Sequence, residues 1–254
     1  MIELEDRGEV TIARMVRGKG NALSLDFMRA LIDMFDELER RPTKAVVITG
    51  QGSVFCAGVD LPTLAAGGAE YVREFLPALL QGFERLAKFP KPLVAAINGH
   101  AIAGGAILVF GCDQRILARG TARMGLTEVL VGVLFPAWAM ELARFATPPE
   151  HFPTLICTGR TWLPEEALVR GLVDELVDAE GLLDRACAVA EELGRIPSAT
   201  FAGTKLAVRR PMLDTATRQT DLERKSIIDY WASPEVLENI TQFVERTIKK
   251  RGSA

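Results

Sequence analysis

The sequence lacks the signatures of several common enzyme classes. Only two histidines occur, His100 and His151, and the four cysteines are far apart with no Cys-x-x-Cys pair, so a metal site is not expected. There is no Gly-x-Ser-x-Gly nucleophile elbow and no P-loop, and the glycines between 99 and 105 do not have the spacing of a dinucleotide-binding turn. These absences argue against an α/β-hydrolase, a P-loop nucleotide hydrolase and a Rossmann dehydrogenase.

Long apolar runs and an excess of basic charge are also missing. No apolar stretch is long enough to cross a bilayer, and the acidic start of the chain has the pattern of neither a signal peptide nor a transit peptide. The net charge is −3 and there is no basic stripe of the kind that nucleic acids require. Scattered single cysteines favour a reducing compartment. We therefore expect a cytoplasmic protein without a membrane span and without a nucleic-acid partner.

What is present indicates an α/β fold. The chain has 254 residues, of which 48% are hydrophobic, so it can form one large domain with a substantial core. Apolar runs at 45–49 and 93–97 read as buried strands. Leu25, Met28 and Leu31 begin a helical pattern that Ser24 can cap. A strand within residues 2–15, this helix and the strand at 45–49 follow one another in the chain. This strand–helix–strand order predicts a parallel sheet.

The remaining segments predict further elements. Residues 2–15 alternate as a hairpin, and residues 112–118 and 121–124 read as strands. The pair Gly67 and Gly68 predicts a mobile loop before a helical pattern that runs to residue 90. Four successive helices are expected near the C-terminus, separated by prolines that include Pro211, and the composition changes near residue 195. The helices are expected at 180–194, 198–209, 211–231 and 234–250.

Two glycine-containing turns follow buried strands. Residues 97–106 read INGHAIAGGA and precede an apolar helix, and residues 50–61 read GQGSVFCAGVDL. Free N–H groups at the start of a helix can hold a developing negative charge. If the two turns face each other, they provide two converging donors, as in an oxyanion hole. The alternative is that the glycines only allow a helix to pack against a sheet.

One carboxylate, Glu128, lies in an apolar segment. Burial without a partner raises the pKa of a carboxyl group and prepares it for acid–base chemistry near neutral pH. An exposed glutamate at a turn, or one bonded by backbone N–H groups, is the alternative. His100 lies at the central turn, where it is either a base or a side chain that stabilises the loop.

Taken together, these stretches resemble the crotonase superfamily, the enoyl-CoA hydratases and isomerases. The matching stretches occur in family order and cover most of the chain. They are residues 21–24 (NALS), 55–61 (FCAGVDL), 98–101 (NGHA), 104–105 (GG), 112–113 (CD), and 165–174 (EEALVRGLVD).

The resemblance implies a repeated β-β-α superhelical core over residues 1–195. It also implies a helical region over 196–254 that serves oligomerisation, as a homotrimer or a dimer of trimers. The implied substrates are acyl-CoA thioesters, with coenzyme A as part of the substrate and no separate cofactor.

By position, the resemblance assigns the oxyanion donors to the N–H groups of Val59 and Gly104, and the catalytic carboxylate to Glu128. Each donor is expected to lower the barrier by about 3 kcal/mol. The further residues expected to contact substrate are Ala22, Ala57, Gly58, Asp60, Leu61, Ile107 and Thr127.

The chain departs from the hydratase pattern at one position. Hydratases of this family carry two glutamates, and Ile107 stands where the first is expected. A single carboxylate suits a double-bond isomerisation, so we expect a Δ3,Δ2-enoyl-CoA isomerase in which Glu128 moves one proton from C2 to C4. The alternatives are a hydratase or another crotonase reaction, with Asp60, Glu70 or Glu74 as a second acid beside Glu128, and a non-catalytic acyl-CoA-binding protein. Candidate residues for an acyl pocket are Leu64, Leu76, Leu134 and Phe135.

Overall fold

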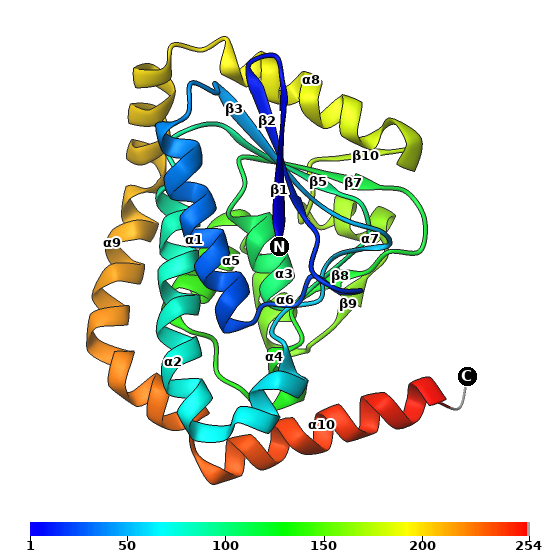
Figure 1. Ribbon diagram of the computed structural model, residues 1–254, viewed down its shortest axis with the longest axis vertical. Helices are drawn as coiled ribbons and strands as arrows, with labels where there is room; N and C mark the ends of the chain where they lie inside the picture. The colour runs from blue at the N-terminus through cyan, green and yellow to red at the C-terminus, as the bar shows by residue number, and fades with distance from the viewer. Residues whose placement is uncertain (253–254) are drawn as a thin grey trace.

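The computed structural model describes residues 1–252 and contains two sheets surrounded by helices (Figure 1). The strands are β1 (Ile2–Arg7), β2 (Val10–Met15), β3 (Ala45–Gly50), β4 (Val54–Cys56), β5 (Leu93–Ile97), β6 (His100–Ile102), β7 (Gln114–Ala118), β8 (Met124–Gly125), β9 (Thr161–Trp162) and β10 (Glu175–Val177). The helices are α1 (Leu25–Arg40), α2 (Leu61–Lys88), α3 (Gly104–Phe110), α4 (Glu128–Val131), α5 (Ala137–Ala146), α6 (Phe152–Cys157), α7 (Pro164–Val169), α8 (Leu182–Gly194), α9 (Ser198–Trp231) and α10 (Pro234–Gly252), with a 3-10 turn at Ala179–Gly181.

The strands follow a repeating order. One sheet has the order β1-β2-β3-β5-β7-β10 and the other β4-β6-β8-β9, so β3–β4, β5–β6 and β7–β8 each place one strand in either sheet before a helix follows. The larger sheet is parallel except for the β1–β2 hairpin. The predicted repeated β-β-α class is confirmed, and so are the hairpin and the parallel sheet.

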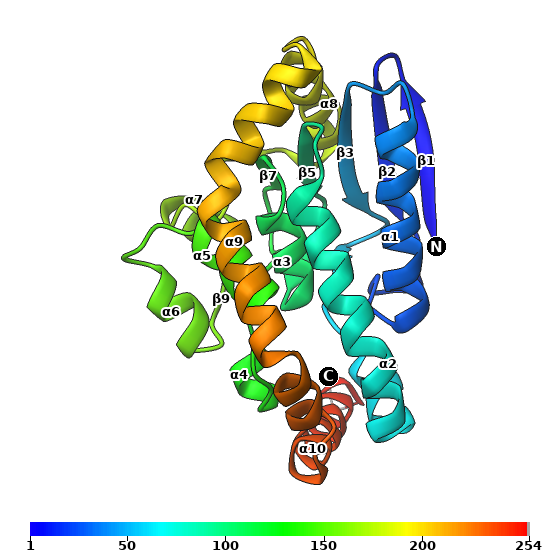
Figure 2. The same cartoon turned by 90° about the vertical axis from the view of Figure 1, so that its left-hand side faces the viewer.

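Both faces of the larger sheet are buried, as parallel sheets require. Alternate strand residues such as Ile12, Val47 and Val94 pack under α8, and their neighbours pack under α1, α2 and α3. Helix α9 runs along the side of the molecule past α5 and α2, and α10 crosses its end (Figure 2). This end of the molecule also contains α4 and the start of α2. No helix in residues 1–252 is long and apolar enough to cross a membrane.

The structure corrects the predictions for Gly67–Gly68 and for residues 121–124. Gly67 and Gly68 form no loop: α2 continues past them with a kink at Gly68, where φ is 59°, because Leu64 and Val72 on either side are both buried. The strand expected at 121–124 covers only Met124 and Gly125.

Pro211 was expected to separate two helices, but it lies inside α9. A proline removes one helical hydrogen bond and usually bends or ends a helix. Here the turns on both sides are held by the core, since Arg209, Met212 and Leu213 are all buried. Tertiary packing therefore outweighs the local cost of the proline. The predicted boundary near residue 195 falls between α8 and α9, and residues 253–254 of the predicted C-terminal region lie outside the described residues.

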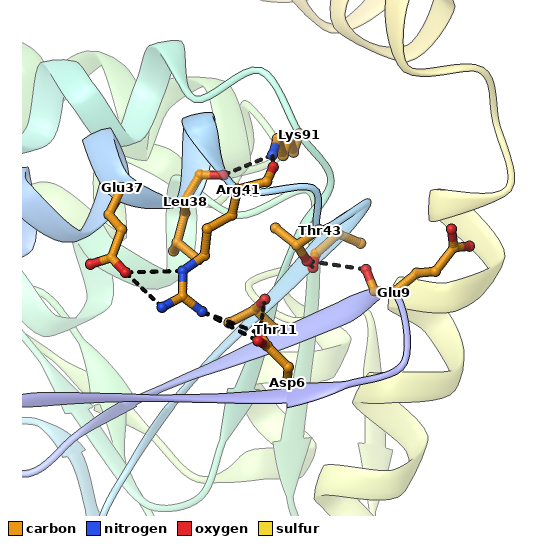
Figure 3. A network of polar contacts seen from close by, with 9 residues as sticks. Asp6, Glu9, Thr11, Glu37, Leu38, Arg41, Thr43 and Lys91 are labelled. Carbon is orange, nitrogen blue, oxygen red and sulfur yellow. Dashed lines mark hydrogen bonds and ion pairs between the residues drawn. The ribbon is translucent and has the colours of Figure 1, made fainter.

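Polar contacts hold the segment that links α1 to β3 against the N-terminal hairpin (Figure 3). The Arg41 guanidinium pairs with Glu37 at 2.6 Å and with Asp6 at 3.4 Å. The Lys91 ammonium donates to the carbonyl oxygens of Leu38 and Arg41 at 2.7 and 2.6 Å. The end of α1 is thereby tied both to β1 and to the segment before β5.

A buried ionic cluster attaches α9 to the core. Asp113 accepts from the Lys205 ammonium at 2.7 Å and from the Arg209 guanidinium at 2.8 Å, and both cations are less than 10% exposed. Arg209 also donates to the carbonyl oxygens of Ala87 and Gly111. Burial lowers the pKa of Lys205 to about 8, and Asp113 opposes that change. The carboxylate of Asp113 therefore balances charge that α9 could not otherwise bury.

Asp113→Asn is expected to lower the free energy of unfolding by about 3–5 kcal/mol, because it leaves two buried cations without a counter-charge. Urea unfolding followed by circular dichroism measures the change. Asp33→Asn on the exposed face of α1 is the matched control and should change stability by less than about 0.5 kcal/mol. A loss at Asp113 no larger than that of the control would contradict this account of the cluster.

Candidate active site

Two glycine turns meet at one edge of the smaller sheet. Strands β4 and β6 pair in parallel, so the turns that follow them emerge side by side. Gly58 has a φ of 84°, and a Cβ placed there would lie 2.8 Å from the Ile102 carbonyl oxygen and 2.8 Å from the Ala103 Cβ. A side chain at Gly58 would therefore push the turns apart. The two turns are in direct contact, with Gly104 N close to Gly58.

Each turn contains a backbone N–H group that has no partner among the described residues. Ala103 precedes α3 with a φ of 53°, which is uncommon for a residue with a Cβ and orients the first N–H group of the helix. Within residues 1–252, neither Val59 N nor Gly104 N donates a hydrogen bond to the protein. The next glycine, Gly105, packs so closely on β4 that a Cβ would lie 2.1 Å from the Cys56 carbonyl oxygen. Two unpartnered N–H groups thus lie on closely packed backbone.

The segment before α1 holds the first turn in place. Leu23 N donates to the Gly58 carbonyl oxygen at 2.8 Å, and Asp60 N donates to the Leu23 carbonyl oxygen at 3.0 Å. The buried Asn21 side chain donates to the carbonyl oxygens of Val54 and Phe55, each at 3.1 Å. The stretch around Asn21 is therefore bonded to both sides of the turn that carries Val59.

A cavity of about 230 Å³ opens beside the two turns. Among the described residues that line it, Glu128 is the only ionisable one, and nearly all the others are apolar. Val59, Gly104, Ile107 and Thr127, which the sequence analysis had singled out, also line this cavity. The remaining lining residues are Ala57, Leu61, Leu79, Phe83, Ile102, Ala103, Leu130, Val131, Val133, Pro136, Ala139, Trp231 and Phe243.

Glu128 is buried at the first position of α4. Its side chain lies in the cavity wall, the residue is 9% exposed, and its Oε2 atom is buried with no hydrogen-bond partner among the described residues. Burial raises the pKa of Glu128 from 4.5 to about 7, and the backbone N–H groups of Glu128 and Thr127 partly oppose this rise. Of the interpretations of Glu128, the exposed turn residue does not match the structure: the carboxyl group is buried, and backbone N–H groups satisfy it only in part.

A second hollow of about 380 Å³ adjoins the cavity and shares Ala57, Val59, Leu61 and Phe243 with it. Four predicted substrate-contacting residues lie along this groove: Ala22, Ala57, Asp60 and Leu61. Gly58 is buried behind it. Asp60 pairs with the Arg17 guanidinium at 3.0 Å and caps α2 by accepting from Thr63 N, so its carboxylate is already occupied.

The other acids and bases considered from the sequence lie elsewhere. Glu70 and Glu74 are exposed on α2, and Glu74 lies 3.9 Å from the Arg29 guanidinium. His100 accepts from Arg123 N through Nδ1 and lines neither hollow, which matches a loop-stabilising side chain. Burial raises the pKa of Cys56 to about 12, so this thiol stays protonated. No group of three or more potential metal ligands occurs within the described residues.

The residues considered for an acyl pocket, Leu64, Leu76, Leu134 and Phe135, do not line this cavity, whereas residues from the C-terminal helices do. Leu64 and Leu76 are buried in the core outside the cavity, and Leu134 is 51% exposed. Trp231 at the end of α9 and Phe243 on α10 line the cavity instead. The sequence analysis assigned this region only to oligomerisation, which stays a prediction. The amphipathic pattern of these helices indicated buried faces but not the surface that they cover.

The chain is similar to both hydratases and isomerases. Residues 6–250 match the family model described as enoyl-CoA hydratase/isomerase. A putative enoyl-CoA hydratase of Thermus thermophilus is 37% identical over 190 residues, which are 73% of this chain and 74% of that protein. The mitochondrial enoyl-CoA delta isomerase 1 of Rattus norvegicus is 25% identical over 255 residues, covering 99% of this chain and 88% of that protein.

A solved structure matches nearly the whole chain. The crystal structure of human mitochondrial delta3-delta2-enoyl-CoA isomerase superposes with a TM-score of 0.93 and 25% sequence identity, covering 98% of each chain. The match therefore extends beyond the β-β-α core to the helices α9 and α10.

Glu128→Gln is expected to stabilise the protein at pH 8. The folded protein keeps a proton on Glu128 between pH 4.5 and about 7 that the unfolded chain releases. Wild-type stability therefore falls across that range and stays lower above it, by at most about 3 kcal/mol. The variant has no such group to ionise. Urea unfolding of both proteins at pH 4 and pH 8 should show the advantage only at pH 8, and an equal difference at both pH values would contradict it.

Proposed function

The chain belongs to the enoyl-CoA hydratase/isomerase family, and we propose that it converts 3-enoyl-CoA thioesters to trans-2-enoyl-CoA thioesters. The observation that carries this proposal is a single buried carboxyl group, Glu128, in an apolar cavity beside two unbonded N–H groups. An isomerisation needs one group that first removes and then returns a proton, and this site contains one such group.

In the proposed reaction the thioester carbonyl oxygen accepts hydrogen bonds from Val59 N and Gly104 N. Glu128 in its carboxylate form removes a proton from C2, and the electrons move onto the carbonyl oxygen as a dienolate. The two donors stabilise that negative charge, and backbone donors held rigidly before the reaction do so without reorganising. The carboxyl group of Glu128 then gives the same proton to C4, which restores the carboxylate and leaves the double bond between C2 and C3.

The apolar walls support isomerisation over hydration. Adding water to a double bond requires a water molecule that is held and activated. The position where the resemblance places the other glutamate of hydratases is occupied by Ile107, which is fully buried. Exclusion of water also protects the dienolate from side reactions. The groove that contains Ala22 and Asp60 is the proposed path of the coenzyme A portion.

A hydratase is the second candidate, because a relative with 37% identity carries that name. A hydratase would need a second acid near Glu128, and the three carboxylates considered from the sequence are either exposed or engaged elsewhere. A non-catalytic acyl-CoA-binding protein would not need the buried carboxyl group of Glu128, whose Oε2 atom has no partner among the described residues and whose burial costs stability.

Purified protein given a 3-enoyl-CoA is expected to form a product of unchanged mass, and given a 2-enoyl-CoA it should form no hydrated product at a comparable rate. Glu128→Gln should lower kcat by about 10²–10⁴-fold, because the general base is lost. Mass spectrometry of the products and ultraviolet absorbance of the conjugated thioester are the measurements.

The matched controls are Glu70→Gln and Glu74→Gln, which change exposed carboxylates to amides and should keep wild-type kcat. Rapid formation of a product heavier by one water would support the hydratase instead. Activity that survives in Glu128→Gln would remove Glu128 from the reaction.

The activity is expected to rise with pH and level off above an inflection near pH 7. Glu128 must be ionised to remove the proton, and burial raises its pKa to about 7. A profile of kcat/KM between pH 5 and pH 9 measures this. An activity that is already maximal at pH 5 would mean that the reacting carboxyl group has an ordinary pKa.

A further inference from the structure

The residues that line the apolar cavity fall into two groups. Ala57, Val59, Leu61 and Phe243 line both the cavity and the adjoining groove, so they mark the place where the two meet. Other residues line the cavity alone. The two largest of these are Phe83 and Trp231, and neither lines the groove.

Trp231 is held firmly in this wall. It is 2% exposed at the last position of α9, and its indole Nε1–H donates to the Leu134 carbonyl oxygen at 3.0 Å. The preceding residue, Tyr230, donates from its hydroxyl to the Gly132 carbonyl oxygen at 3.3 Å. Both bonds reach the segment that directly follows α4, the helix that begins with Glu128.

That segment is itself part of the cavity. Val131 and Val133 line it, and the N–H groups of Gly132 and Val133 donate to the Glu128 carbonyl oxygen at 3.0 and 3.2 Å. The indole ring therefore cannot move away from the cavity without breaking its bond to Leu134. Its position is fixed by the same turn that carries the carboxyl group.

We propose that Trp231 limits the length of the acyl chain that this site accepts, because its bonded indole ring is a fixed part of the cavity wall that the groove does not share. This inference rests on the proposed function, since it assumes that an acyl thioester enters from the groove. The cavity has a volume of about 230 Å³, so only a chain of limited length fits in front of the ring.

The cavity wall also limits the chemistry of that chain. Among the described residues in the lining, Thr127 and Glu128 provide the only polar side chains, and both lie on the turn at the start of α4. A hydroxyl or charged group farther along the chain would be buried without a partner, at a cost that rejects it. The accepted chains are therefore hydrocarbon beyond the reacting carbons.

Trp231→Leu tests the inference because the smaller side chain enlarges the cavity at this position. Affinities are measured by calorimetry for hexanoyl-, octanoyl-, decanoyl- and dodecanoyl-CoA, which are saturated and do not react. The wild-type protein should gain affinity with chain length up to one member of this series and lose it for the longer ones. The variant should bind dodecanoyl-CoA at least about tenfold better than the wild type, with little change for hexanoyl-CoA. Trp231→Phe removes one ring and the N–H donor, and should give a smaller shift in the same direction.

Trp138→Leu is the matched control, because Trp138 is also buried but does not line the cavity. It should lower stability without changing the order of affinities. An unchanged series in both Trp231 variants, or the same shift in Trp138→Leu, would overturn the inference. Because the thioesters are saturated, a shift in the series supports the role of Trp231 even if the protein proves not to isomerise 3-enoyl-CoA, whereas isomerase activity with an unchanged series removes only this inference.

Discussion

The close contact between two glycine turns is the constraint on which the site depends. Gly58 and Gly105 lie where a Cβ would come within 2.8 Å and 2.1 Å of neighbouring backbone oxygens, and this absence of side chains brings Val59 N and Gly104 N to one cavity. The β-β-α repeat makes the contact by pairing β4 with β6 in parallel, so that both turns leave the same edge of the smaller sheet. Ala103 completes it with a backbone conformation that residues with a Cβ seldom adopt.

A second feature opposes the stability of the fold. Glu128 is buried with an unpartnered oxygen, and the raised pKa records the free energy needed to ionise it there. Buried polar groups are normally bonded, and Asp113 shows the ordinary arrangement in the same chain, with two cations on its carboxylate. The contrast between Asp113, whose carboxylate pairs with two cations of α9, and Glu128, whose Oε2 atom has no partner among the described residues, supports the proposal that Glu128 transfers the proton.

Much of this arrangement was predictable from the sequence because it depends on local patterns. The glycine positions, the buried strands that precede them, the capping by Ser24 and the isolated carboxylate at 128 all appear in short stretches. Pro211 and the pair Gly67–Gly68 usually interrupt a helix, but α9 and α2 continue through them because buried residues on both sides hold each helix in place. That Trp231 and Phe243 line the cavity was not predicted, because it depends on where α9 and α10 dock. No short sequence pattern indicates that docking position.

The central claim is that one carboxyl group moves one proton within a largely apolar cavity. The most direct test uses a 3-enoyl-CoA with deuterium at C2, converted in ordinary water under single-turnover conditions, with the product analysed by mass spectrometry and nuclear magnetic resonance. Transfer by Glu128 alone predicts that a substantial part of the deuterium appears at C4 of the 2-enoyl product. Complete loss of the label to solvent, with no deuterium at C4, would show that water or a second group supplies the proton and would contradict the account.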